Sequence, residues 1–309
     1  MPEKMSTQDI QHFETSLEER RRYIIDTLKL EDNKLIDTKQ KLEQITQIFL
    51  DHWGILDING DRLAKFKCQE KLEIVTRGPP VASKTRFVNP ILAEKVKLKL
   101  QEWIDSGIVI PSTSPWQSPL VIVPKKTAPF IRIAVDYRGI NAVTENLRYP
   151  LPNIQDCIAR LSNKSIFTNL DIKEAFHSLE IQENSIDKTS ITTQWGNFAF
   201  TRANFGLKNV PSFWSMMIKK VFQPLGNDYL IHFLDDGLIF SDDFETHLEQ
   251  LKKVLDALLK NGLILQLKKC NVVKNEIEFL GFTINNNEIR PIQQRVGVIN
   301  KIPYPAPIK

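Results

Sequence analysis

The sequence predicts an α+β fold built on an antiparallel sheet, and three observations support this prediction. Apolar residues alternate along residues 165–172, as they do in a strand. Two short apolar runs, 229–233 and 238–240, flank an acidic dipeptide, which is typical of a β-hairpin. An amphipathic helical stripe follows over residues 248–259. Hairpin strands pair in antiparallel orientation, so we expect an antiparallel sheet with this helix packed beneath it.

The predicted hairpin carries two adjacent carboxylates, Asp235 and Asp236, at its tip. Each raises the pKa of the other unless a cation or a donor compensates the charge. The Asp236-Gly237 dipeptide is itself a hairpin signal, because Gly accepts the positive φ that a tight turn requires. An isolated Asp-Asp-Gly is more often a solvated acidic turn than a metal site. A third carboxylate on a neighbouring strand would favour the metal site.

The strand over residues 165–172 supplies a third carboxylate. Its apolar face runs from Ile166 to Ile172, so Asn169 and Asp171 lie on the opposite face and point away from the apolar layer. Two divalent cations about 3.5 to 4 Å apart can activate a 3′-hydroxyl and stabilise a leaving pyrophosphate, given carboxylates from two adjacent strands. Asp171, Asp235 and Asp236 are therefore the candidate metal ligands and catalytic residues.

Helical spacing of apolar residues predicts further helices. One covers residues 39–53 and precedes the breaker Asn59-Gly60, another covers residues 94–107, and the helix over 248–259 is closed by Asn261-Gly262. Residues 1 to about 40 are charged and lack such a stripe, which predicts a linker with partial helix. The apolar positions of the three helices are Leu42, Ile45, Phe49 and Leu50; Val96, Leu98, Leu100 and Trp103; and Leu248, Leu251, Val254, Leu255, Leu258 and Leu259.

Composition narrows the function classes only slightly. With 309 residues, of which 42% are hydrophobic and 25% charged, the chain can bury a substantial core. Lys and Arg total 41 against 37 acidic residues, a net charge of +4 that excludes a strongly basic binder of nucleic acid but is compatible with a polyanionic partner. Charge alone does not point to nucleic acid.

The cysteines and the hydropathy pattern bear on the compartment. Cys68, Cys157 and Cys270 are odd in number and widely spaced, so neither a disulfide framework nor a zinc site is implied, and a reducing compartment is expected. No apolar run approaches the roughly 18 residues of a membrane span, and the N-terminus lacks a signal-peptide core. We expect no membrane partner and a location in the cytoplasm, in a virus-like particle or in the nucleus.

Six short motifs follow one another along the chain: Val135-Asp136-Tyr137-Arg138-Gly139-Ile140-Asn141, Tyr149-Pro150-Leu151-Pro152, Phe167-Thr168-Asn169-Leu170-Asp171-Ile172, Phe205-Gly206-Leu207-Lys208-Asn209, Phe233-Leu234-Asp235-Asp236 and Phe279-Leu280-Gly281-Phe282. In this order they resemble the motifs of reverse transcriptases of gypsy-type long-terminal-repeat retroelements, which are related to retroviral polymerases. The resemblance runs from about Lys71 to about Pro307, with Ser112 to Pro119 similar to the fingers segment of that group. It implies a right-hand polymerase fold, with fingers and a palm.

The resemblance implies two Mg²⁺ or Mn²⁺ ions held by the three aspartates and the backbone of Ile172. It also implies that Arg132 and one of Lys125 or Lys126 clamp a nucleotide triphosphate from a fingers hairpin, although a solvated strand end is an equally good reading of the lysines. Asp136 and Arg138 are expected to form a structural pair rather than a catalytic one.

Further residues implied by the resemblance surround the incoming nucleotide and the primer. Phe176 resembles an aromatic gate against the ribose 2′-hydroxyl, although an aromatic in this setting is more often simply core. Phe205 and Gly206 resemble the segment beneath the incoming base, where a missing side chain allows close backbone approach. Lys269 is expected near the triphosphate. Leu280-Gly281 resembles the primer grip, with a routine hairpin turn as the alternative.

The sequence departs from the family pattern at three places. Ala203-Asn204 stands where most relatives have Met-Pro, and Gly237 replaces a β-branched residue or Leu after the aspartate pair. Gly at a strand start costs up to about 1 kcal/mol relative to a side chain that packs. The segment before Arg132 lacks the usual Asp-Gly turn, so Pro129 requires another turn type.

These observations predict three regions: an N-terminal extension with helix over residues 1–75, fingers and palm over 76–289, and the start of a truncated thumb over 290–309. The predicted function is RNA-directed DNA polymerase, with a primed RNA or DNA template and dNTPs as substrates, within a polyprotein that supplies protease, RNase H and integrase. A decayed or domesticated fragment that binds nucleic acid or protein is the first alternative. The second, an RNA-dependent RNA polymerase, is disfavoured by Phe176.

Overall fold

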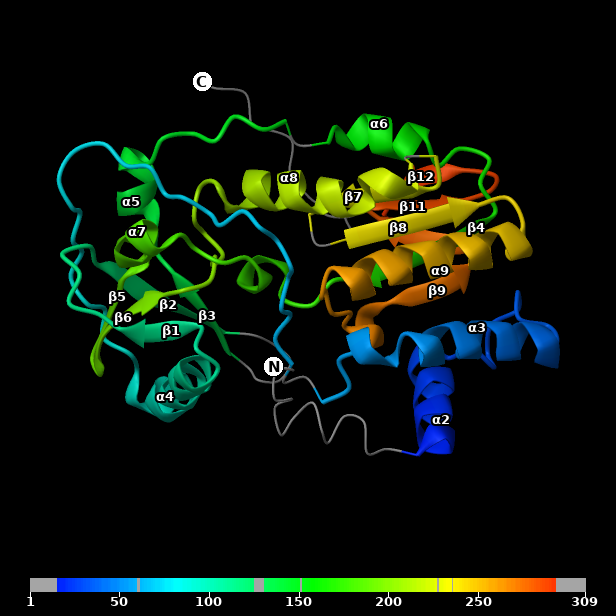
Figure 1. The fold of residues 1–309 in the computed structure, drawn as a ribbon, viewed down its shortest axis with the longest axis horizontal. Coiled ribbons are helices and arrows are strands. Elements are labelled where there is room, and N and C mark those ends of the chain that lie inside the picture. Colours follow the sequence, from blue (N-terminus) through cyan, green and yellow to red (C-terminus); the bar gives the residue numbers. More distant parts are fainter. Residues whose placement is uncertain are drawn as a thin grey trace, which may run out of the picture.

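The computed structural model describes residues 16–59, 62–124, 131–150, 152–226, 228–234 and 236–292. Four sites singled out from the sequence, Lys125, Lys126, Pro129 and Asp235, lie outside these ranges, as does the predicted thumb segment beyond residue 292. The described chain forms two lobes, one around a five-stranded sheet and one around a four-stranded sheet (Figure 1).

The four-stranded sheet has the order β7-β8-β4-β9, and every neighbouring pair in it is antiparallel. This is the antiparallel sheet that the sequence predicted. The outer strand β7 pairs with β8, and β4 lies between β8 and β9. The strands are β4 (Ile166–Asp171), β7 (Leu230–Phe233), β8 (Asp236–Ser241) and β9 (Asn271–Lys274).

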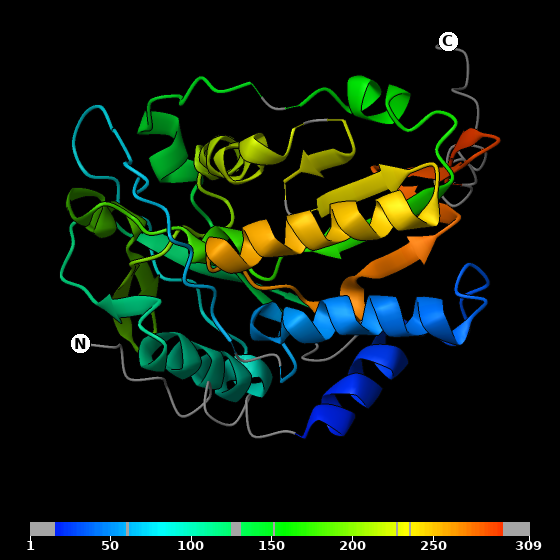
Figure 2. The ribbon, with the colours of Figure 1, turned by 45° about the vertical axis from the view of Figure 1, so that its right-hand side comes forward.

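Both faces of this sheet are covered. The helix α9 (Phe244–Lys260) packs on one face, with α3 beside it (Figures 1 and 2). On the other face, Phe167 belongs to a second apolar cluster with α6 (Ile154–Ala159) and the three-stranded sheet β10-β11-β12. Our prediction of a single apolar face for 165–172 was therefore incomplete, because Phe167 is fully buried on the face that carries Asp171. The three-stranded sheet comprises β10 (Glu276–Phe279), β11 (Phe282–Asn285) and β12 (Ile289–Pro291).

The hairpin β7–β8 is present, but its turn precedes Asp236 and does not fall on the Asp236-Gly237 dipeptide that suggested it. Phe233 pairs with Asp236, so the turn lies between these two strand residues, and Leu234 within it has φ of +52°. Gly237 pairs with Leu170 within the sheet and does not have positive φ. A Cβ at this position would meet the carbonyl oxygen of Leu170 at an ordinary 3.8 Å. Gly237 is therefore not required by the turn.

The other lobe contains a five-stranded sheet of order β1-β6-β5-β2-β3, in which only β2 and β5 are parallel. The predicted fingers hairpin corresponds to the antiparallel pair β2–β3. The helix α4 (Pro90–Asp105) begins earlier than predicted, because Asn89 caps it and proline occupies its first turn. Its Leu98 is 58% exposed rather than buried. The strands are β1 (Val109–Pro111), β2 (Ser118–Pro124), β3 (Ile131–Val135), β5 (Ile191–Thr193) and β6 (Gly196–Phe200).

The described part of the N-terminal segment packs into the main core, which corrects our prediction of a linker with only partial helix before residue 40. The helix α2 (Leu17–Leu28) begins with a capping box in which Ser16 and Glu19 exchange hydrogen bonds, and its Ile24 is fully buried. The next elements are α3 (Lys39–Asp51), close to its predicted bounds, and η1 (Trp53–Ile55). The stripe on α2 was missed because charged residues separate its few apolar positions.

The α9 stripe matches the prediction except at Leu259, which is 42% exposed. The helix ends at Asn261, and Gly262 follows with φ of +69° and no room for a side chain beside the carbonyl oxygen of Lys65. No helix in the described ranges combines the length and apolarity that a membrane crossing requires. All three cysteines are free thiols. The remaining helices are α5 (Arg138–Val143), η2 (Ala175–Ser178), α7 (Glu183–Ile186), η3 (Asp187–Thr189), α8 (Val210–Phe222), η4 (Gln223–Leu225) and η5 (Leu267–Lys269).

Candidate active site

Two predicted carboxylates meet at the end of the four-stranded sheet. Asp171, the last residue of β4, pairs directly with Asp236, the first residue of β8. Side chains of directly opposed residues in an antiparallel pair lie on one face with Cβ atoms about 4.5 to 5.5 Å apart. The register therefore brings together two carboxylates that are 65 positions apart in the sequence. Asp235 lies outside the described residues.

The electrostatics of this pair favour a cation. Burial raises the pKa of Asp171 above its ordinary value, while Lys269 acts in the opposite direction. Burial also raises the pKa of Asp236, and the charge of Asp171 raises it further. Like charges directly opposed in a sheet are destabilising. A bound cation would reduce the repulsion between these two carboxylates.

Lys269 and Cys270 approach Asp171 from the segment after α9. The Lys269 Nζ lies 3.5 Å from the Asp171 Oδ2, too far for a strong ion pair, and both side chains reach solvent. The Asp171 amide donates to the Cys270 Sγ at 3.4 Å. Burial raises the pKa of the Cys270 thiol to about 12, so this sulfur remains a neutral acceptor. No local pattern around Cys270 predicts this contact.

The turn of the β7–β8 hairpin is fixed by a residue that we did not predict. The indole Nε1 of Trp214, a fully buried residue of α8, donates to the Leu234 carbonyl oxygen at 2.7 Å. A buried Trp N–H requires an acceptor, and here it finds the turn that precedes Asp236. Trp214 follows closely on the Phe205–Asn209 motif, but nothing local shows that its ring reaches the hairpin.

Three predicted nucleotide-binding residues form a stack. The ring centroids of Phe176 and Phe205 lie 4.7 Å apart, and the Arg132 guanidinium lies 5.2 Å from the centroid of the Phe205 ring. Phe205 is partly exposed, whereas Phe176 is only 5% exposed and belongs to the main core. Phe176 thus belongs to the core and also contacts the surface ring of Phe205, which in turn contacts Arg132.

The segment around Gly206 is held by asparagine side chains. Gly206 has φ of +95°, and a Cβ would lie 3.3 Å from the Val135 carbonyl oxygen, so the close approach requires glycine. Asn141 donates to the Gly206 carbonyl oxygen at 2.7 Å. Asn204, at one of the family departures, accepts from the Phe205 amide at 2.8 Å and from the His177 Nε2 at 3.2 Å. This departure therefore adds anchoring contacts to the segment.

Leu280 and Gly281 form the two-residue turn between β10 and β11. Their φ values of +51° and +91° are those of a tight hairpin turn. The flanking Phe279 and Phe282 pair directly, and Phe279 is buried against the palm sheet cluster that includes Phe167. The hairpin turn is thus present, and its role as a primer grip remains a prediction.

Asp136 and Arg138 form the structural pair that we expected. The Arg138 Nη2 lies 2.8 Å from the Asp136 Oδ2, and Arg86 contacts the same oxygen at 2.5 Å. These guanidinium groups hold the pKa of Asp136 well below its usual range. With two cations already bound, Asp136 is poorly placed for proton transfer.

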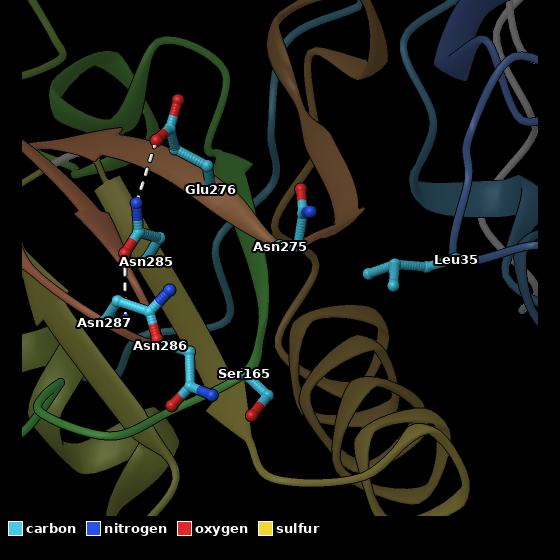
Figure 3. Close-up of a pocket in the computed structure, with 7 residues that line it drawn as sticks. All are labelled: Leu35, Ser165, Asn275, Glu276, Asn285, Asn286 and Asn287. Atoms are coloured by element: carbon cyan, nitrogen blue, oxygen red, sulfur yellow. Dashed lines mark hydrogen bonds between the residues drawn. The ribbon is translucent and has the colours of Figure 1, made fainter.

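A cavity of about 500 Å³ lies at the other end of the palm sheet (Figure 3). Ser165, which lines it, precedes β4, whereas Asp171 ends β4. Six residues of strand span about 20 Å. The cavity is therefore remote from the carboxylate pair. Its other lining residues are Leu35, Asn275, Glu276, Asn285, Asn286 and Asn287.

A family model described as reverse transcriptase (RNA-dependent DNA polymerase) matches residues 123–284, which include the whole four-stranded sheet and the carboxylate pair. The chain belongs to the reverse transcriptase family. Reverse transcriptases use divalent metal ions, which agrees with a paired-carboxylate site. The predicted family and its fingers and palm fold are thereby confirmed.

Relatives identify the branch of the family. The retrovirus-related Pol polyprotein from transposon 297 of Drosophila melanogaster is 34% identical over 238 residues, covering 76% of this chain and 22% of the relative. The corresponding polyprotein from transposon gypsy is 29% identical, covering 69% of this chain and 21% of the relative. The chain thus spans about a fifth of the length of these curated relatives.

Solved structures share the fold. The foamy viral protease-reverse transcriptase dRH in complex with double-stranded DNA has a TM-score of 0.82 at 18% identity, covering 97% of this chain and 53% of that chain. The foamy viral protease-reverse transcriptase in complex with an RNA/DNA hybrid has a TM-score of 0.81 at 18% identity, covering 94% and 38%. The N-terminal helices and the three sheets of this reverse transcriptase therefore belong to a shared architecture.

Proposed function

We propose that this chain is an RNA-directed DNA polymerase that adds dNTPs to a primer 3′-hydroxyl with release of pyrophosphate. The observation that carries the proposal is the register of β4 against β8, which opposes the half-buried Asp171 and Asp236 at one end of the sheet. An opposed acidic pair destabilises a fold unless it binds a cation. Membership of the reverse transcriptase family supplies the matching chemistry.

The donor set suits hard divalent cations. Carboxylate and carbonyl oxygens are the ligands that Mg²⁺ takes, with substrate phosphates completing its octahedral shell. Asp171, Asp236, the backbone of Ile172 and, from its sequence position, Asp235 would hold two such ions. When bound, the ions lower the pKa of the attacking hydroxyl and neutralise charge on the leaving pyrophosphate.

The neighbouring residues would orient the nucleotide. Lys269, whose ammonium lies 3.5 Å from Asp171, is positioned to shift towards a triphosphate oxygen. Arg132 would meet the triphosphate from the fingers side, together with Lys125 or Lys126, and Phe205 and Gly206 would lie beneath the base. Phe176 would limit space at the 2′-hydroxyl, which favours deoxynucleotides. Leu280-Gly281 would position the primer end.

The partners follow from this assignment. We infer a primed RNA or DNA template and dNTPs as substrates. The relatives in which this region occurs are Pol polyproteins, so protease, RNase H and integrase domains are the expected neighbours. The solved reverse transcriptases that share this fold carry an RNA/DNA hybrid or double-stranded DNA.

Primer extension tests the proposal directly. Asp171→Asn and Asp236→Asn should each lower single-nucleotide extension by at least about 10³-fold, because each removes a metal ligand. Asp242→Asn is the matched control, since Asp242 is an exposed aspartate just beyond β8 whose partner is Lys164 at 2.9 Å. Extension retained in either site variant would refute the assignment. A wild-type chain that binds primer-template but never extends it would favour the non-catalytic alternative.

A further inference from the structure

A buried ion pair joins the N-terminal segment to the loop that follows Asp171. The Lys173 Nζ lies 2.9 Å from the Asp57 Oδ2, and these side chains are only 7% and 1% exposed. The other carboxylate oxygen, Asp57 Oδ1, accepts from the Arg62 amide at 3.3 Å. A fully buried, hydrogen-bonded ion pair fixes geometry more than it adds stability. Lys173 lies two residues after Asp171, so the pair can hold the backbone next to this carboxylate.

Backbone hydrogen bonds reinforce the same junction. Leu265 forms a parallel bridge with Leu56 and an antiparallel bridge with Ile172, so three distant segments make a small buried sheet. The Asp57 amide donates to the Leu265 carbonyl oxygen at 3.0 Å, and the Lys173 amide donates to the Ile264 carbonyl oxygen at 2.8 Å. The Asp57–Lys173 pair closes this sheet from its two outer segments.

The junction reaches both sides of the carboxylate site. The Gln266 amide donates to the carbonyl oxygen of Asp171 at 2.9 Å, and the Lys269 amide donates to the Gln266 carbonyl oxygen at 2.9 Å. One short segment therefore holds the backbone of Asp171 and begins the turn that presents Lys269. A shift of the 264–266 segment would move both groups.

The loop also contains backbone strain that needs support. Glu174 adopts φ of +43°, a left-handed conformation that is unfavourable for a residue with a side chain. Such residues persist only where surrounding contacts over-determine the conformation. Glu174 directly follows Lys173, and Phe176 lies two residues beyond. The residue directly before this strained position, Lys173, is the one that forms the buried ion pair.

We propose that Asp57 is a positioning residue of the polymerase site, acting through Lys173 to hold the loop from Ile172 to Phe176 and the backbone of Asp171. The proposal rests on the proposed function for its catalytic meaning. It assigns a role to a segment outside residues 123–284, the region that matches the family model. The N-terminal extension is thus a component of the active site and not only a connector.

The test separates positioning from stability by replacing the pair with apolar residues of similar size. Asp57→Leu combined with Lys173→Met removes both charges, so no buried charge is left unpaired. The matched control is Asp242→Leu with Lys164→Met, which removes an ion pair of the same 2.9 Å length from an exposed position on the palm. Thermal unfolding of each variant is measured first, and Asp57→Glu with Lys173 intact serves as a second variant if the double variant does not fold.

Hydrogen exchange and metal dependence are the deciding measurements. We expect amides 172–176 and 264–267 of the Asp57→Leu/Lys173→Met variant to exchange at least about tenfold faster at a matched fraction folded, while the rest of the palm is unchanged. The Mg²⁺ concentration that half-saturates primer extension should rise at least about fivefold, and the control should change neither quantity. A double variant with wild-type exchange and wild-type Mg²⁺ dependence would show that the pair is only structural and overturn the proposal.

The exchange measurement also separates this proposal from the proposed function. It needs no catalysis, so a wild-type chain without extension activity would refute the polymerase assignment while local exchange still reports on the loop. Mn²⁺ binding to the metal-free chain, followed by electron paramagnetic resonance, supplies the second readout in that case. Unchanged Mn²⁺ affinity together with unchanged exchange would overturn the positioning role on its own.

Discussion

Two acidic sites lie next to Ile172: Asp171 precedes it in the chain, and Asp57 pairs with Lys173, which follows it. The charge of the carboxylate is compensated in one site and not in the other. Asp57 is buried and meets Lys173 at 2.9 Å, so its charge is compensated within the protein. Asp171 opposes another carboxylate, and its nearest cation, Lys269, is 3.5 Å away and 59% exposed. The first arrangement needs nothing further. The second is left under-compensated, which is the condition for binding cations from solution.

The backbone and the side chain of Asp171 differ in the same way. The buried pair and its small sheet hold the backbone of Asp171, while the side chain of Asp171 keeps access to solvent. A metal site requires both properties, because ligands must be held in place yet remain reachable. Substitutions in the buried pair and in the carboxylate pair can therefore test rigidity and access separately.

The largest effect is expected from breaking the buried pair. Asp57→Asn leaves the Lys173 ammonium buried without a counter-charge, which should lower the free energy of unfolding by about 3 to 5 kcal/mol. Asp242→Asn breaks an exposed pair and should cost less than about 1 kcal/mol. Urea denaturation of both variants measures the difference. Equal losses would mean that burial does not distinguish the two pairs.

The strand that carries Asp171 is also held by a buried histidine of α9, His247, which contacts Thr168. This contact makes the stability of the fold depend on pH. His247 is fully buried, with its Nε2 2.7 Å from the Thr168 Oγ1 and its Nδ1 2.8 Å from the Ser241 Oγ. Burial lowers the pKa of His247 to about 4. The unfolded chain therefore binds a proton that the folded chain does not bind between about pH 6.5 and 4.

Stability should consequently fall as pH falls through this window, by roughly 3 kcal/mol from this group, with no further loss from it below pH 4. His247→Gln should be less stable at pH 7, since Thr168 and Ser241 lose a matched partner, but its stability should depend less on pH between 7 and 4. Urea titrations at several pH values give both quantities. A variant with the wild-type pH slope would assign the acid sensitivity to other groups.

A smaller effect is expected from replacing Phe176, whose ring contacts Phe205. Phe176→Val opens space beside Phe205 and should reduce the preference for dNTPs over rNTPs by about 1 to 3 kcal/mol, measured as the ratio of kcat/KM values. Phe222→Val removes an equally buried ring, 4% exposed against 5%, from the far half of α8. The control should lose stability and keep its preference. The same preference in both variants would identify Phe176 as core alone.

The smallest effect has the opposite sign to the first. Asp236→Asn removes the repulsion with Asp171 and should stabilise the metal-free chain by up to about 1 kcal/mol. The raised pKa of Asp236 means that the folded state prefers the protonated carboxyl, so the wild-type penalty develops as pH rises above the ordinary value of 3.8. The gain should vanish at low pH and reverse in Mg²⁺, which binds and stabilises the wild type. A destabilised variant without metal would contradict the under-compensated pair.

Local patterns were sufficient for much of this fold. Alternation predicted β4, the apolar runs predicted the β7–β8 hairpin, and a 3.6-residue period predicted α9, because each pattern reflects which side chains one element buries. The same reasoning misplaced Leu259 and the hairpin turn, and it missed the packing of α2 into the core. In each case the deciding contact comes from a distant segment, which sequence spacing does not contain.

The candidate site divides in the same way. The identity of Asp171 and Asp236 could be inferred from the chain, because adjacent strands and acidic residues are visible in it. Their direct opposition, the Trp214 hydrogen bond to the turn and the Asp57–Lys173 pair could not be inferred, because these contacts join residues 65, 20 and 116 positions apart in the sequence. Local sequence limits which side chains a strand or helix can bury, whereas tertiary packing decides which charges find partners.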